Sequence, residues 1–170
     1  AAARFPPPPR RPPPPLLPST TTLAVRNVPA RYTQEELLLA WPPDGSYDFL
    51  HRPAGMEEKR VSRHVFMNFT SSAAAAAFQL KWHAKFFRQH GKGRALDIVA
   101  ASIQGYKGNM KQVFTRLDID GDQCLPAVFR GTMRLDAREE ADRLRLRPRP
   151  PGLQGPHASS SSCSAEWPPR

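Results

Sequence analysis

Residues 61–69 read Val-Ser-Arg-His-Val-Phe-Met-Asn-Phe, and this stretch decides the fold of the chain. Successive side chains of a strand point to opposite faces, so Val65, Met67 and Phe69 share one face that suits a hydrophobic core. The other face carries Ser62, His64, Phe66 and Asn68. An aromatic ring and an imidazole on that second face indicate either a binding surface or a plain half-buried strand.

Further strands and helices are predicted around this stretch. Residues 22–29, 47–50 and 96–101 have the alternation of strands. A capping box at 33–36 (Thr-Gln-Glu-Glu) begins one helix, and Thr-Ser-Ser at 70–72 begins a second. The order β-α-β-β-α-β predicts an α+β fold of the ferredoxin-like type. In that fold two helices cover one face of a four-stranded antiparallel sheet, and the first and third strands are neighbours at its centre.

The second helix contains a regular aromatic spacing. Phe78, Trp82 and Phe86 recur every four residues, which predicts a stripe that packs into the core. Gly91 and Gly93 are expected to end this helix. Beyond the last strand, residues 109–116 can form a third short helix, and residues 136–146 a charged one.

Proline marks the ends of the chain. Nine of the 20 prolines lie in residues 1–20 and six in residues 147–170, so both segments are predicted to be disordered. We expect the domain itself at 21–116 and an extension at 117–146 that packs on or near it. Residues 6–15 (PPPPRRPPPP) favour polyproline II, which suits either a stiff linker or a ligand of an SH3 or WW domain.

Charge favours a polyanionic partner. Residues 21–116 carry 14 Lys and Arg against 7 Asp and Glu, within a chain of net charge +10. A generally basic, soluble protein is the alternative. No apolar run approaches the ~20 residues that span a bilayer, so no membrane contact is expected. Cys124 and Cys163 have no partner spacing, which favours a reducing compartment, the nucleus or the cytoplasm.

Catalysis, metals and cofactors are not predicted. The chain has no nucleophile motif, phosphate-binding glycine loop, paired core carboxylates or metal-spaced His and Cys set. Asp118, Asp120 and Asp122 alternate like a calcium loop, but Gln123 and Phe129 stand where its glycine and glutamate would be needed.

Four stretches resemble one family. Residues 21–29 (TTLAVRNVP), 31–33 (RYT), 47–50 (YDFL) and 103–105 (IQG) are similar to the carboxy-terminal RNA recognition motif of the Mei-two-like proteins. Residues 62–69 can also be aligned with the longer RNA-recognition signature, which Phe66, Met67 and Phe69 match. The resemblance covers about residues 21–116 and implies a non-enzymatic regulator of RNA fate that binds single-stranded RNA.

The resemblance also implies a site on the exposed sheet face. Phe66 would stack a base with His64 beside it, whereas Ala24 stands where a stacking aromatic is common. Arg26 would contact a phosphate or stack, and Arg63 would contact backbone near the strand entry or only solvent. The remaining candidates are Asn68 and Ser62 for base edges, and Lys107 and Lys111 as an extension of the basic surface. Two alternatives stay open: the third helix covers Phe66, or the fold binds a partner peptide instead of RNA.

Overall fold

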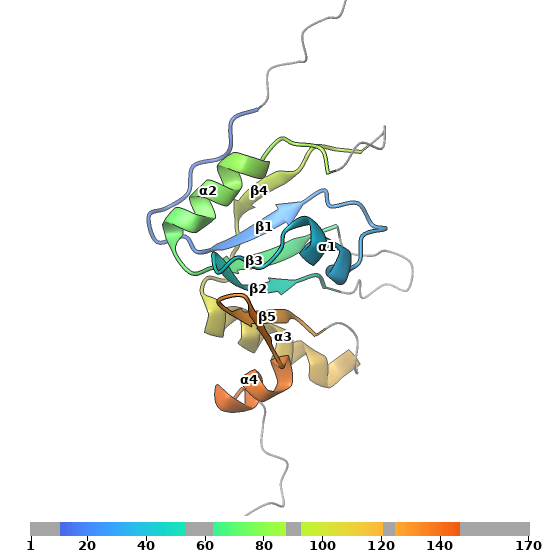
Figure 1. The fold of residues 1–170 in the computed structure, drawn as a ribbon, viewed down its shortest axis with the longest axis vertical. Coiled ribbons are helices and arrows are strands. Elements are labelled where there is room, and N and C mark those ends of the chain that lie inside the picture. Colours follow the sequence, from blue (N-terminus) through green and yellow to red (C-terminus); the bar gives the residue numbers. More distant parts are fainter. Residues whose placement is uncertain (1–10, 54–62, 88–92, 121–124, 147–170) are drawn as a thin grey trace, which may run out of the picture.

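The computed structural model describes residues 11–53, 63–87, 93–120 and 125–146, without side chains at 116–120. Ten elements follow one another along the chain (Figure 1). They are β1 (Thr22–Arg26), α1 (Gln34–Ala40), β2 (Tyr47–His51), β3 (Val65–Phe69), α2 (Ser72–Trp82), β4 (Asp97–Ala100), α3 (Tyr106–Asp120), β5 (Ala127–Arg130), β6 (Met133–Leu135) and α4 (Ala137–Arg143).

One antiparallel sheet runs through the molecule in the order β4-β1-β3-β2-β5-β6. Its first four strands and the two helices between them confirm the predicted ferredoxin-like arrangement, with β1 and β3 adjacent at the centre. The expected number of strands was wrong, because β5 pairs with β2 and extends the sheet to six strands. Hydrogen bonds from β5 thus satisfy an edge of β2 that a four-stranded sheet would leave open.

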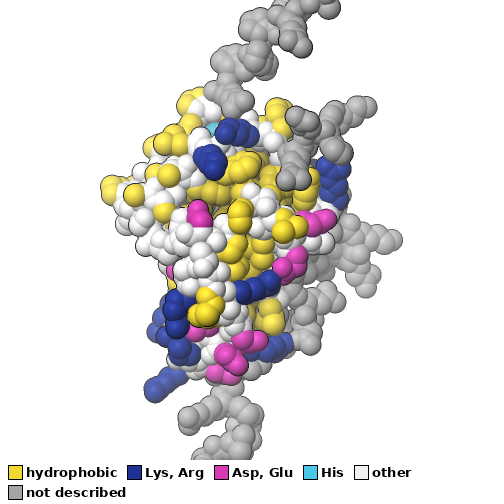
Figure 2. All heavy atoms as spheres, in the orientation of Figure 1, with side chains coloured by type: hydrophobic (Ala, Val, Ile, Leu, Met, Phe, Trp, Pro, Cys, Tyr) yellow, Lys and Arg dark blue, Asp and Glu magenta, His cyan; other side chains and the backbone are white. Residues whose placement is uncertain are grey.

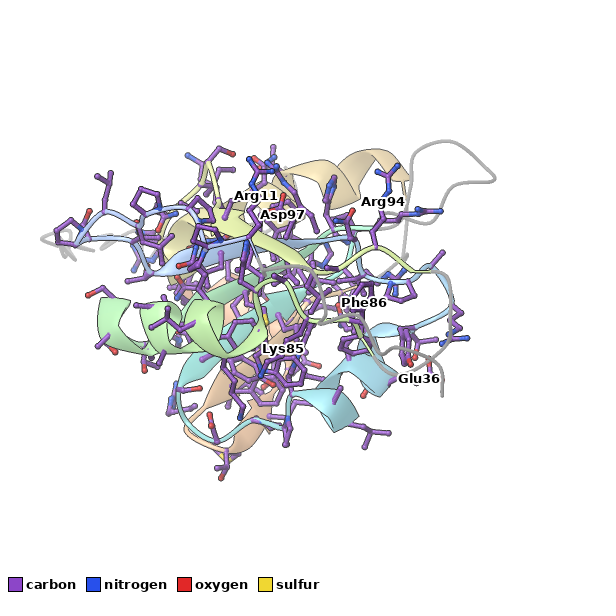
Figure 3. The ribbon with its side chains drawn as sticks, turned by 90° about the horizontal axis from the view of Figure 1, so that it is seen from above. Arg11, Glu36, Lys85, Phe86, Arg94 and Asp97 are labelled. Atoms are coloured by element: carbon purple, nitrogen blue, oxygen red, sulfur yellow. The ribbon has the colours of Figure 1, made fainter. Side chains whose placement is uncertain are left out.

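Helices lie on both faces of the sheet (Figure 3). On one face, α1 and α2 enclose the main core, in which Leu23, Val25, Met67 and Ile98 are fully buried. On the opposite face, α3 and α4 enclose a second apolar cluster around Phe49. We call that opposite side of the sheet the second face.

The start of α1 follows from local sequence. Thr33 caps the helix by accepting from the Glu36 amide, and the Glu36 carboxylate accepts from the Thr33 amide at 2.7 Å, which confirms the predicted capping box. Trp41 ends the helix, and its carbonyl accepts a hydrogen bond from the Tyr47 hydroxyl at 2.6 Å. The first helix is therefore joined to the start of β2.

The end of α2 differs from the prediction. The helix stops at Trp82 because Ala84 adopts φ +58° and the chain turns to pair with Leu96. Phe78 and Trp82 pack on the main core as expected, but Phe86 does not: it is 65% exposed. The expectation that Gly91 and Gly93 close this helix is likewise wrong.

Other element bounds shift by several residues. β1 ends at Arg26 because Asn27 has φ +64°, and the third strand begins at Val65. α3 is longer than expected, since it starts at Tyr106 and continues to Asp120. Of the expected 117–146 extension, residues 125–146 contribute β5, β6 and α4, in which Val128 and Phe129 are buried.

The described part of the proline-rich segment lies against the domain. Leu16 packs on the main core, and the Pro14 carbonyl accepts from the Gln79 side chain at 2.9 Å. Residues 11–20 thus differ from the expectation of disorder, because α2 offers them a hydrogen bond and apolar surface. Residues 6–10 of the proposed SH3 or WW ligand, and the 147–170 tail, lie outside the described residues.

Candidate nucleic-acid interface

A row of side chains crosses the second face of the sheet. The strand register places Ala24 between Val99 and Phe66, and Phe66 next to His51. Ala24 pairs with Phe66 because β1 and β3 are adjacent inner strands, so the Phe66 ring lies near the middle of the sheet. One ring from β3 and none from β1 face this side at the centre.

The third helix covers part of this face, which answers one alternative left open by the sequence. Met110, Val113 and Phe114 of α3 pack with Phe49 and with Val128 of β5. Phe66 is half-buried and lies against the same cluster. The helix therefore covers the β2–β5 side and reaches as far as Phe66, without hiding that ring completely.

The β1–β4 side of the second face is more open. We call this area the open strip and define it by its side chains Arg26, His64, Phe66, Asp97 and Val99, which are half-buried or exposed. Arg26 and Asp97 form an ion pair at 3.5 Å, with 49% and 42% of their side chains exposed. An exposed pair of this kind is worth only about 0–1 kcal/mol. Arg26 can therefore exchange Asp97 for a phosphate at little cost.

Asn68 is placed differently from the prediction. Its side chain is 3% exposed and lies inside a polar network, where its oxygen accepts from the Thr22 hydroxyl at 2.8 Å. Its amide nitrogen donates to Asp48 at 2.7 Å. Because these bonds occupy the amide within the protein, we leave Asn68 out of the proposed contact surface.

The same network attaches α3 to the sheet through residues that mark the family resemblance. The Gln104 side chain accepts from the amides of Thr21 and Thr22 and donates to the carbonyls of Thr22 and Ala101, all at 2.8–2.9 Å. Gly105 takes φ +84°, a conformation that favours glycine. The Gln-Gly pair belongs to the 103–105 stretch of the family resemblance, but its structural role depends on partners more than 80 residues away.

Two further bonds complete the attachment. The Gly105 amide and the Asn109 side chain both donate to the Thr22 hydroxyl, at 2.9 and 3.0 Å. The Thr22 side chain therefore links β1, β3 and the first turn of α3. Burial raises the pKa of the Asp48 carboxyl at the far side of this network, although the Asn68 amide opposes the rise.

Glu140 joins α4 to α3 and lies close to β5. Its carboxylate accepts from the Tyr106 hydroxyl at 3.0 Å and from Arg143 at 2.8 and 3.0 Å, and Arg130 lies 3.6 Å away. Hydrogen bonding to Arg143 lowers the pKa of Glu140. Burial and the neighbouring Glu140 raise the pKa of Tyr106. α3 and α4 are thus held together by the hydrogen bond from Tyr106 to Glu140 as well as by apolar packing.

The other predicted contact residues are mostly exposed. Arg63 and His64 lie at the entry to β3, while Lys107 and Lys111 lie on α3. Ser62 is outside the described residues. Figure 2 shows the α1–α2 face, where apolar side chains are prominent and Lys and Arg gather towards α4.

Among the residues that the structure describes, no group of three or more His, Cys, Asp or Glu side chains is arranged to hold a metal ion. None of the helices found there is both long enough and apolar enough to cross a membrane.

The order of the first six elements and the neighbouring β1 and β3 define an RNA recognition motif, a class of domains that bind RNA. The model of the family described as RNA recognition motif 2 matches residues 20–114, and the chain belongs to this family.

Similar proteins agree with the resemblance to Mei-two-like proteins. Protein MEI2-like 2 of Arabidopsis thaliana is 31% identical over 87 residues, which cover 50% of this chain and 10% of that protein. Protein terminal ear1 of Zea mays is 26% identical over 161 residues, covering 84% of this chain and 23% of that protein. The chain therefore spans about a tenth to a quarter of these relatives.

Solved structures include the second such domain of the yeast poly(U)-binding protein Pub1. It is 24% identical, with a TM-score of 0.41, and the match covers 51% of this chain and all of that one. A Sex-lethal protein–RNA complex is 20% identical, with a TM-score of 0.39, and the match covers 51% of this chain and 50% of that one.

Proposed function

We propose that this chain binds single-stranded RNA on the open strip and thereby regulates the fate of that RNA. The observation that carries the proposal is the position of Phe66. Its ring keeps partial exposure at the border of α3, next to the exposed His64 and one strand away from Arg26. A stacking surface with adjacent cations is the arrangement that single-stranded RNA requires.

Each residue has a distinct role in the proposed complex. A base stacks on the exposed part of Phe66, an interaction worth about 1–3 kcal/mol. Arg26 leaves Asp97 to meet a phosphate, and Arg63 adds a second positive charge at the entry to β3. His64 offers its imidazole beside the stacked base. These roles need no movement of α3.

The site is small, and its affinity is expected to be correspondingly modest. Ala24 supplies no ring, and α3 occupies the β2–β5 side of the face. Stacking is therefore limited to Phe66 with His64, so that phosphate contacts supply much of the binding energy. The observed dissociation constant should then rise steeply with salt.

The test is fluorescence anisotropy of the full chain with a labelled, randomised single-stranded RNA pool over a salt series. Phe66→Leu keeps an apolar side chain against α3 but removes the ring, so we expect binding five-fold or more weaker, in line with about 1–3 kcal/mol per stacked base. A plot of the logarithm of the association constant against the logarithm of the salt concentration should have a slope of about −0.7 for each phosphate neutralised.

Leu39→Ser is the matched control, because Leu39 is 80% exposed on α1, on the other face of the sheet. It should bind RNA like the parent. Equal binding by the parent and by Phe66→Leu would contradict stacking on this ring.

A partner peptide is the second candidate, and the covering layer favours it. α3 and α4 cover part of a face that RNA would otherwise use, and β5 and β6 extend the sheet beyond β2. Absence of RNA binding by the folded parent would make this candidate the leading one.

A further inference from the structure

Phe86 is an aromatic side chain that the core does not use. It is 65% exposed, whereas its neighbour Phe87 is 6% exposed. Phe87 makes the core contacts, with ring centroids 4.6 Å from Tyr32 and 5.1 Å from Trp41. Packing therefore gives no reason for a large ring at position 86.

The backbone places Phe86 beside the edge of the sheet. The Ala84 amide donates to the Leu96 carbonyl at 2.9 Å, and the Leu96 amide donates to the Lys85 carbonyl at 2.8 Å. Residues 84–87 thus lie alongside the segment that leads into β4. That segment is tied to the end of β1, because the Asn27 side chain donates to the Ala95 carbonyl at 2.9 Å.

This order brings Phe86 close to the open strip. From β1 the next segment outward leads into β4, and the one after that contains Phe86. Two strand spacings amount to about 10 Å. An RNA strand that continues past Arg26 can cover this distance with a few nucleotides.

Cations flank the ring in Figure 3, where Lys85 lies on the α2 side of Phe86 and Arg94 on the opposite side. Arg94 is exposed and lies two residues before Leu96. Lys85 lies over the Trp82 ring at 5.8 Å, and Arg31 over the Tyr32 ring at 5.2 Å. The charge thus favours an anion over an apolar partner surface.

The carboxylates described near this edge are those of Asp97 and Glu36. Asp97 pairs with Arg26 in the free protein and is released where Arg26 meets a phosphate, whereas the Glu36 carboxylate accepts from the Thr33 amide. None of the ion pairs found among the described side chains involves Arg94. Because Arg94 is exposed, its guanidinium can reach a ligand.

We propose that RNA leaving the open strip crosses the β4 edge and stacks a further base on Phe86, with Arg94 contacting its phosphate. This inference rests on the proposed function and extends the same site. Phe86 then supplies, outside the sheet, a second stacking ring that Ala24 does not provide within it. The complete site is longer than the sheet face alone.

The test compares two randomised RNA pools, of four and twelve nucleotides, by fluorescence anisotropy with the full chain. Phe86→Ser should weaken binding of the twelve-nucleotide pool five-fold or more and leave the four-nucleotide pool unchanged. Arg94→Gln should weaken the longer pool and reduce its salt slope. Leu80→Ser is the matched control, because Leu80 is 70% exposed on α2.

The outcomes separate the two proposals. If Phe66→Leu weakens both pools while Phe86→Ser behaves like Leu80→Ser, the extension is wrong and the site on the sheet stands. If the folded parent binds neither pool, both proposals fail. A twelve-nucleotide RNA containing 4-thiouridine should in addition photo-crosslink to the peptide that carries Phe86, and crosslinks confined to other peptides would contradict the extension.

Discussion

Gln104 makes more contacts than a single surface side chain usually does. Its amide joins the start of β1 to the turn before α3 through four hydrogen bonds. Gln104→Ala should lower the free energy of unfolding by about 1–3 kcal/mol, since each such bond has a net value near 1 kcal/mol and the group is partly solvated. Urea unfolding followed by tryptophan fluorescence measures the change.

Ser102→Ala, at a neighbouring exposed position, is the control and should leave the free energy of unfolding within about 0.5 kcal/mol of the parent. A Gln104→Ala protein as stable as this control would show that the four bonds are replaced by water.

Asp48 predicts a pH dependence of stability. Burial raises its folded-state pKa above the ordinary value of 3.8, so the folded protein holds this proton more tightly than the unfolded chain. Stability is therefore lost as the pH rises through the folded-state pKa. Asp48→Asn keeps an oxygen to accept from Asn68 but carries no charge.

The free energy of unfolding of Asp48→Asn relative to that of the parent should accordingly increase from pH 4 to pH 7. Urea midpoints of both proteins across that range test this. A difference that does not change with pH would contradict the assigned shift.

Local residue roles could be read from the sequence, whereas distant ones could not. The capping box needs only Thr33 and Glu36, three positions apart, and it was predicted correctly. Asn68 was expected to face RNA because its strand parity is right. Its partners, the Asp48 carboxylate and the Thr22 hydroxyl, come from two other strands. A local sequence pattern cannot reveal contacts between residues that are distant in the chain.

Glu140 of α4 accepts a hydrogen bond from Tyr106 of α3 and pairs with Arg143 of its own helix and with Arg130 of β5. Glu140→Gln removes the charge that Arg143 and Arg130 meet, so the free energy of unfolding at pH 7 should fall by about 1–3 kcal/mol. The pKa of Glu140 is lowered in the folded protein. Its contribution is therefore present above the ordinary pKa of 4.5 and is lost as the pH falls through the lower, folded-state value.

The deficit of Glu140→Gln should accordingly shrink below about pH 4.5, which urea midpoints at pH 3.5 and 7 would reveal. Glu139→Gln, on the exposed side of the same helix turn, is the control. If both variants lose equal stability, the loss comes from helix charge in general and not from the contacts of Glu140 with Tyr106, Arg143 and Arg130.

Strand and helix types followed from periodicity, but their ends depended on contacts between elements. The four-residue spacing of Phe78, Trp82 and Phe86 predicted a helix beyond its real end. The helix stops because Leu96 offers backbone hydrogen bonds to residues 84 and 85. Such pairing joins segments more than ten residues apart, and the helical pattern contains no trace of it.

For the whole molecule, the important boundary lies after α4 rather than after α3. β5 pairs with β2, and Phe129 contacts the main core, where its ring centroid lies 5.6 Å from that of Tyr47. A chain ending at residue 116 would expose Phe49 and Tyr47. At about 1.5–3 kcal/mol for each of these two large side chains, we expect it to lose about 3–6 kcal/mol, which approaches the stability of a small domain.

Circular dichroism and urea unfolding of residues 11–116 and 11–146 test this expectation. The longer chain should unfold cooperatively, and the shorter one should be largely unfolded or bind a hydrophobic dye. Equal midpoints would show that β5, β6 and α4 are accessory. The sequence indicated packing in this region, but the register that adds β5 to the sheet depends on β2, far away in the chain.

That pairing has a consequence for synthesis of the protein. Phe49 finds its strand partner Val128 about 80 positions later in the chain. At about 5–20 residues per second, the ribosome needs roughly 4–16 s to make the intervening segment. During this interval the outer edge of β2 has no partner, and a newly made chain offers an unpaired, apolar strand to its neighbours. Slower translation of residues 50–130 would lengthen this exposure, so the yield of soluble protein should depend on the elongation rate in that segment.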